Sequence, residues 1–118
     1  MAGKSKKSQL EILNQEREHT IKEIENLRAE LRIELEHDDI DDAASDLIER
    51  DKIHALILTL ERKLKDVDHA IKQAQDGAYG ICENCGKKID PDRLEIFPEA
   101  TLCVDCKRQK ERSLRASG

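Results

Sequence analysis

Aromatic residues are almost missing from this chain of 118 residues, which has one Tyr, one Phe and no Trp. Gly and Pro are also scarce, with five and two residues, whereas 40% of the residues are charged. A chain of this length and composition allows one domain of ordinary size but lacks the large side chains that a broad core needs. Its many Glu, Lys, Leu, Ile and Arg residues favour long helices packed along a narrow apolar seam.

Other absences restrict where the protein acts. No stretch approaches the roughly 18 apolar residues that a membrane span requires, and residues 1–7 are basic with no apolar export segment. The formal net charge of −5 argues against a nucleic-acid binder held by bulk positive charge. The lack of a membrane span predicts a soluble protein, and free-thiol chemistry predicts a cytoplasmic one. No nucleophile–base pair or phosphate loop is found, so we do not expect an enzyme.

Cysteine is absent from the first 81 residues, and all four cysteines then form two Cys-x-x-Cys pairs, Cys82 with Cys85 and Cys103 with Cys106. Two such pairs separated by about 15 to 20 residues supply the four thiolates of a tetrahedral zinc site. Four cysteines leave no open position for water, so we expect one structural Zn²⁺. The alternatives are two disulfides, which need an oxidising compartment, and a redox pair, which needs a βαβ setting.

Two long segments have the heptad spacing of paired helices. The first runs from residue 8 to about 35 without Gly or Pro, and the second ends at Asp76–Gly77, where Gly supplies a left-handed cap. Each is apolar on one stripe only, and the connection between them is short. This favours an antiparallel hairpin, with arms of about 40 Å, over helices that pair with another chain. On the first helix the expected seam has polar breaks and is widened by two flanking residues: Leu10, Leu13, Arg17, Thr20, Ile24, Leu27, Leu31 and Glu34, with Ile21 and Leu35 on the flank. On the second helix the expected seam residues are Ala43, Leu47, Ile53, Ile57, Leu60, Leu64, Val67, Ile71 and Ala74.

The connection between the two helices is strongly acidic. Residues 34–51 contain nine carboxylates and one Arg, and four Asp residues fall within 38–42. One or two of them suit the N-terminus of the helix that begins there. Four within five residues repel one another, which favours an acidic tip that reaches a cationic or metal-containing site on a partner. A solvated turn without further function is the alternative.

The expected organisation has three parts. Residues 1–7 form a basic, flexible N-terminus, residues 8–76 form the coiled-coil hairpin with its acidic tip near 38–43, and residues 77–118 form the zinc finger and a C-terminal helix. That helix is basic, but the chain lacks aromatic residues for stacking on bases, so we do not expect sequence-specific DNA binding. The four histidines, at positions 19, 37, 54 and 69, are predicted to be ordinary helix residues.

These features together resemble the DksA/TraR family of bacterial transcription regulators. The resemblance is carried by the Asp-x-x-Asp-x-Ala pattern of Asp38–Ala43, and by the segments Tyr79–Gly86, Arg93–Pro98 and Leu102–Lys107 around the cysteines. It implies a mostly α fold in which a long antiparallel hairpin precedes a four-cysteine zinc finger. It also implies a factor that binds RNA polymerase by inserting the hairpin into the secondary channel.

The resemblance also assigns residues. Asp38 and Asp41 would be the working carboxylates of the tip, and Ala43 would keep the tip slim at a close contact. Phe97 stands where some members have an arginine that helps bind guanosine tetraphosphate, whereas Lys107 matches a basic position of that site. We expect a monomer with RNA polymerase as its partner. A Gre-like transcript-cleavage factor and a structural coiled-coil protein are the alternatives.

Overall fold

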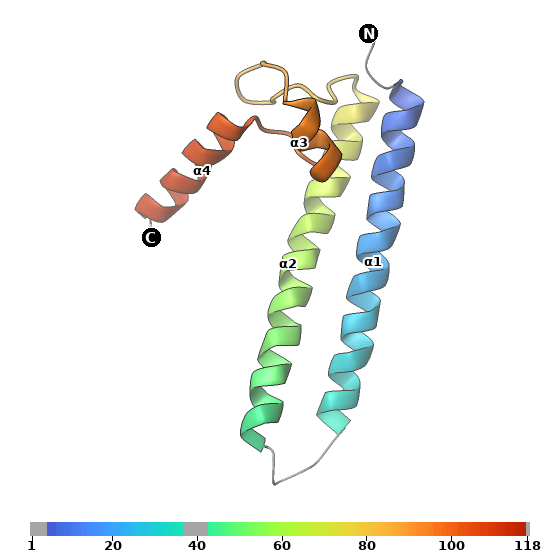
Figure 1. Ribbon diagram of the computed structural model, residues 1–118, viewed down its shortest axis with the longest axis vertical. Coiled ribbons are helices and arrows are strands. Elements are labelled where there is room, and N and C mark those ends of the chain that lie inside the picture. The colour runs from blue at the N-terminus through green and yellow to red at the C-terminus, as the bar shows by residue number, and fades with distance from the viewer. Residues whose placement is uncertain (1–4, 37–42, 118) are drawn as a thin grey trace. The chain divides into compact units, whose positions relative to one another are not determined.

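The computed structural model describes residues 5–36 and 43–117, and side-chain burial for residues 5–36 and 47–114. These residues form four helices: α1 (Lys6–Glu36), α2 (Ala43–Gln75), α3 (Pro91–Ile96) and α4 (Val104–Ser117) (Figure 1). The only β pairing in the described ranges is an isolated antiparallel bridge between Ile81 and Lys88. The mostly α fold predicted from the sequence is therefore confirmed. None of the helices is long and apolar enough to cross a membrane, as far as the described residues go.

The ends of the two long helices follow from local chemistry. The hydroxyl of Ser5 accepts a hydrogen bond from the backbone N–H of Ser8 (3.2 Å), which caps the start of α1. At the end of α2, Gly77 has a φ of +79°. The N–H of Ala78 donates to the Gln73 carbonyl (2.8 Å) and that of Gly77 to the Ala74 carbonyl (3.1 Å). This pair of hydrogen bonds is a Schellman motif, so the predicted glycine cap is confirmed.

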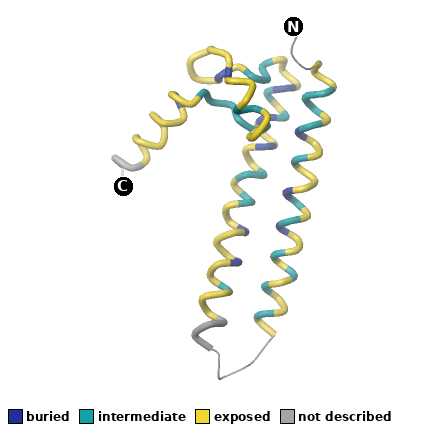
Figure 2. The backbone as a smooth tube through the Cα atoms, in the orientation of Figure 1, coloured by how far each residue is buried: buried dark blue, intermediate teal, exposed yellow. Residues whose placement is uncertain are grey.

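The chain forms two compact units, one made of residues 17–65 and the other of residues 1–16 with 66–118. In both units α1 and α2 lie side by side and run in opposite directions, with buried positions on the facing sides (Figures 1 and 2). This is the predicted antiparallel hairpin. The domain boundaries expected from the sequence remain a prediction.

The unit of residues 17–65 has a core of three buried isoleucines. Ile24 of α1 contacts Ile53 and Ile57 of α2, and half-buried leucines extend this cluster at Leu27, Leu31, Leu60 and Leu64. An exposed ion pair joins the two helices, with 2.7 Å between Arg28 Nη2 and Glu61 Oε1. Because these residues repeat at three- and four-residue spacing, the apolar seam holds this part of the hairpin together.

The expected seam ends earlier than the sequence suggested. Leu47 was predicted to lie on it, but the side chain is 58% exposed. The heptad spacing places the seam positions before Ile53 at residues 50 and 46. Leu47 is one residue away from position 46, which is a rotation of about 100° around the helix. Arg50 takes the seam position, and its Nη2 donates to the backbone carbonyl of Glu34 (2.9 Å). The last turn of α1 has no basic residue of its own, so Arg50 supplies the cation that suits a helix C-terminus.

The other unit holds the start of α1, the end of α2 and the cysteine-containing segment. Leu13 of α1 packs against Ala70 and Ala74 of α2, and Leu10, Ile71 and Tyr79 border this cluster. A second cluster is formed by Cys82, Ile89 and Cys106 with their half-buried neighbours. Asp90 caps α3, since its Oδ1 accepts from the Asp92 N–H (3.0 Å) with Pro91 as the first helical residue. Pro suits this first position, because the N–H that it lacks would have no partner within the helix.

Candidate metal centre

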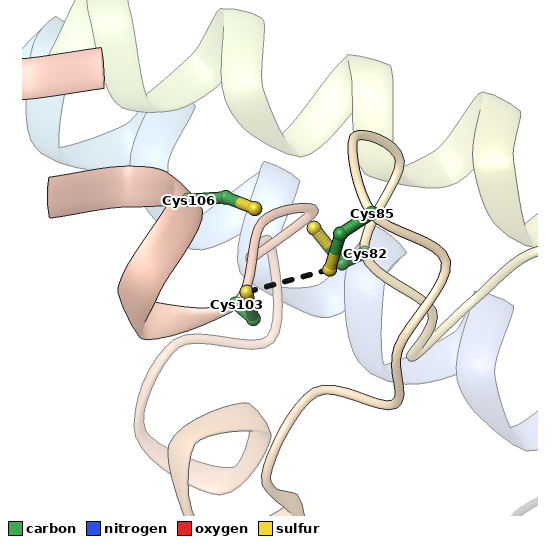
Figure 3. Close-up of side chains that lie close together, drawn as sticks. All are labelled: Cys82, Cys85, Cys103 and Cys106. Carbon is green, nitrogen blue, oxygen red and sulfur yellow. Dashed lines mark hydrogen bonds between the residues drawn. The ribbon is translucent and has the colours of Figure 1, made fainter. Parts of the chain in front are cut away.

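The four cysteine sulfurs lie within 4.8 Å of one another, and no disulfide joins them (Figure 3). The Sγ atoms of Cys85 and Cys103 are 3.8 Å apart. A tetrahedron with Zn–S bonds of about 2.3 Å places neighbouring sulfurs about 3.8 Å apart. The four thiols predicted from the spacing therefore lie close together, and one pair of sulfurs has the separation that a tetrahedral zinc ion requires.

The first cysteine pair is held by a tight turn. The N–H of Gly86 donates to the carbonyl of Cys82 (2.9 Å), and the N–H of Cys82 donates to the carbonyl of Lys87 (2.8 Å). Gly86 has a φ of +78°, which an L-amino acid rarely adopts. This turn brings Cys85 back beside Cys82, so that both sulfurs face the second pair (Figure 3).

The second cysteine pair uses the start of a helix. Cys103 directly precedes α4, Cys106 lies in its first turn, and the Lys107 N–H donates to the Cys103 carbonyl (3.0 Å). Residues three apart on a helical turn lie on the same side of it, which explains why the two sulfurs converge. The C-terminal helix predicted from the sequence is thereby confirmed.

The thiols differ in acidity. Burial opposes ionisation of Cys82, but backbone hydrogen bonds from Cys103 and from two residues of the loop after Cys82 outweigh it and lower the pKa of Cys82 to about 6. Asn84 Nδ2 donates to Cys106 Sγ (3.3 Å), which favours the thiolate. Hydrogen bonds with the other cysteines, together with burial, outweigh this and raise the pKa of Cys106 to about 12. Full ionisation of the cluster near neutral pH therefore needs a cation, which a zinc ion provides.

Glu83, between the cysteines of the first pair, contacts two other segments. Its Oε2 lies 2.6 Å from Nε2 of His69 and accepts from Nε2 of Gln73 (3.4 Å), both on α2. Its Oε1 accepts from Oγ1 of Thr101 (3.2 Å), and the Glu83 N–H donates to the Thr101 carbonyl (2.9 Å). We call Glu83, His69, Gln73 and Thr101 the Glu83 cluster. His69 is a residue of α2, as the sequence predicted, and its ring also contacts the residue next to the first cysteine.

The predicted tip residues are Asp38, Asp41 and Ala43. Asp38 and Asp41 lie outside the described residues, and Ala43 is the first residue of α2 with its side chain outside the described set. Their assignment remains a prediction.

Residues 77–112 match the model of the prokaryotic dksA/traR C4-type zinc finger. The RNA polymerase-binding transcription factor DksA of Caulobacter vibrioides is 36% identical over 109 residues, which span 89% of this chain and 69% of that protein. This chain belongs to the DksA/TraR family. Its four cysteines are accordingly the ligand set of a C4 zinc finger, which confirms the prediction of one structural zinc.

Two further comparisons extend the family assignment. The solved structure of transcription factor DksA2 from Pseudomonas aeruginosa superposes with a TM-score of 0.79 at 29% identity, covering 93% of this chain and 85% of that one. The uncharacterized protein YteA of Bacillus subtilis is 43% identical over 68 residues, which is 58% of this chain. The chain spans only 28% to 34% of the length of the first curated relatives it matches. Where the relatives' names state a function, they name a transcription factor and not an enzyme, in agreement with the prediction for this chain.

Proposed function

We propose that this DksA/TraR-family protein is a transcription factor that binds RNA polymerase directly. The observation that carries the proposal is the similarity to a polymerase-binding transcription factor over 89% of the chain. The antiparallel hairpin and the zinc module, which the family resemblance predicts together, are both found here. A net charge of −5 and the scarcity of aromatic residues favour contact with a protein over contact with a DNA sequence.

The acidic segment between the two long helices is the proposed working end. α1 ends at Glu36 and α2 begins at Ala43, so residues 37–42 connect two helices that are paired by their own apolar seam. By the family resemblance, this segment enters the polymerase secondary channel, with Asp38 and Asp41 as its functional carboxylates. The small side chain of Ala43 keeps the tip slim where it makes a close contact. The zinc module rests on the outer rim of the channel.

Such a factor acts by binding the states of polymerase unequally. A ligand with equal affinity for two states shifts no equilibrium, however tightly it binds. We propose that the carboxylates favour one state of the promoter complex, while the rest of the hairpin and the zinc module supply affinity. Loss of a carboxylate should therefore abolish the effect on transcription while the affinity for polymerase changes little.

The test is a promoter-complex lifetime assay with purified RNA polymerase and the zinc-loaded chain. The Asp41→Asn variant removes one charge with little change of shape, and we expect it to abolish the change in lifetime while affinity stays within a few-fold. Glu49→Gln is the matched control, because Glu49 is an exposed carboxylate of α2 outside the proposed working end.

Three results would count against this assignment. An unfolded Asp41→Asn variant would show that the carboxylate serves folding, and equal effects of the Asp41 and Glu49 variants would show that only net charge matters. Shortening of RNA in a stalled complex would instead favour a Gre-like transcript-cleavage factor.

A further inference from the structure

The Glu83 cluster links the metal centre to α2. Both carboxylate oxygens of Glu83 are used, since Oε2 faces His69 and Gln73 on α2, and Oε1 faces Thr101 just before the second cysteine pair. One side chain therefore joins three segments: the first cysteine loop, the end of α2 and the approach to the second loop. All of these residues belong to the same compact unit.

An isolated surface ion pair would contribute little. The side chains of His69 and Glu83 are 44% and 35% exposed, and pairs of this kind are typically worth less than about 1 kcal/mol. The Glu83 cluster differs because one carboxylate accepts from three side chains, and because the backbone of the same residue is fixed by its hydrogen bond to Thr101. Hydrogen bonds thus hold both the backbone and the carboxylate of Glu83 in place.

The position of Glu83 depends on the metal ligands on either side of it. Cys82 is buried in the cysteine cluster, and Cys85 is 3.8 Å from Cys103, so the ion that binds these sulfurs also fixes the loop that carries Glu83. Without that constraint the loop has few apolar contacts of its own, since residues 83–88 are exposed. The position of this loop therefore determines whether the Glu83 carboxylate contacts His69.

We propose that Glu83 is a positioning residue that couples zinc binding to the order of the C-terminal end of α2. Zinc holds the cysteine loop where Glu83 meets His69 and Gln73, and this contact docks the loop on the helix. Coupling of this kind is reciprocal. Docking of the loop on α2 must therefore raise the affinity for zinc by the same factor by which zinc raises the equilibrium constant for docking. His69, which touches no cysteine, is then a determinant of zinc affinity.

Zinc affinity of the full chain, measured by competition with a chelating dye at one fixed pH, provides the first test. We expect His69→Ala and Glu83→Ala each to lower zinc affinity about fivefold, and the double variant to lower it no further than either single one. Glu83→Gln keeps an acceptor oxygen and should fall between Glu83→Ala and the unaltered chain. Glu95→Ala is the control, because Glu95 is an exposed carboxylate of the same module.

Hydrogen exchange of residues 66–75 provides a second readout. Removal of zinc should speed exchange there about fivefold in the unaltered chain, and Glu83→Ala should show the faster rate even when loaded with zinc. Ala is a good helix former, so His69→Ala should keep α2 intact. The proposal is overturned if His69→Ala leaves zinc affinity unchanged, if the two single effects add in full, or if zinc removal leaves exchange in residues 66–75 unaltered.

Discussion

Tyr79 is the one tyrosine of the chain, and it packs against the buried cluster of Leu13, Ala70 and Ala74. Burial raises the pKa of the Tyr79 phenol, and the nearby carboxylate of Glu99 raises it further. The folded protein therefore keeps the phenol proton at pH values where the unfolded chain loses it. The stability that depends on this proton is complete below a pH of about 10 and is lost as the pH rises through the folded pKa.

Ultraviolet absorbance of tyrosinate can follow this group alone, because the chain has no other tyrosine and no tryptophan. We expect the titration midpoint to lie above about 10 in the folded protein and to return to about 10 in denaturant. Glu99→Gln should lower the folded midpoint part of the way, since burial is the larger cause. A folded midpoint at or below 10 would contradict the packing described for Tyr79.

At the metal centre, the sequence predicted the ligands but not their surroundings. The spacing of the cysteines alone identified all four, because two Cys-x-x-Cys pairs are enough to build a tetrahedral site. Glu83 and His69 are 14 residues apart and lie on different elements, since α2 ends at Gln75, so the period of one helix does not relate them. The spacing of His69 and Gln73, four residues apart on one helix, was the only available signal, and it indicates a shared face without naming its partner.

At the scale of the elements, periodicity predicted the paired helices because their stability depends on one apolar stripe each. Leu13, Ile24, Ile53, Ile57 and Val67 are buried as the heptad spacing requires. The prediction failed at Leu47, where an apolar residue lies one position off the stripe. Arg50 occupies the seam there through a hydrogen bond to a backbone carbonyl, a contact that apolar patterns do not reveal. The acidic tip itself lies outside the described residues and stays a prediction.

Arg50 should stabilise the end of α1 from the neighbouring helix. In Arg50→Met the length of the side chain is kept, but the carbonyl of Glu34 loses its charged donor. Since such a hydrogen bond contributes about 1.4 kcal/mol, amide exchange in the last turn of α1 should become about tenfold faster. Arg28→Met, which removes an exposed ion pair of the same unit, should change exchange there less than twofold. Equal effects of the two variants would contradict a specific role for Arg50.

At the scale of the whole molecule, two kinds of stabilisation operate in different parts of the chain. The unit of residues 17–65 depends on the Ile24, Ile53 and Ile57 cluster. The cysteine-containing segment has only a small cluster around Cys82, Ile89 and Cys106, which cannot match the roughly 10–16 kcal/mol that structural zinc contributes in small fingers. The metal therefore decides whether residues 77–112 fold, whereas the paired helices of residues 17–65 do not depend on it.

Removal of zinc by a strong chelator tests this division. We expect amides of residues 77–112 to lose their protection from hydrogen exchange, while those of residues 17–36 and 47–65 keep theirs. Far-ultraviolet circular dichroism should retain most of its helical signal, because α1 and α2 make up most of the helix. Cys82→Ser with zinc present should resemble the chelated chain. Cooperative loss of all helix on chelation would contradict the account.

Direct binding of the zinc-loaded chain to purified core polymerase tests the proposal that this DksA/TraR-family protein binds RNA polymerase. We expect a saturable one-to-one complex without promoter DNA, whose affinity changes at most a few-fold when Asp38 and Asp41 are both replaced by Asn. We also expect the affinity to fall at least tenfold when the zinc module is unfolded by Cys82→Ser. Absence of a complex between core polymerase and the folded, zinc-loaded chain would contradict the account.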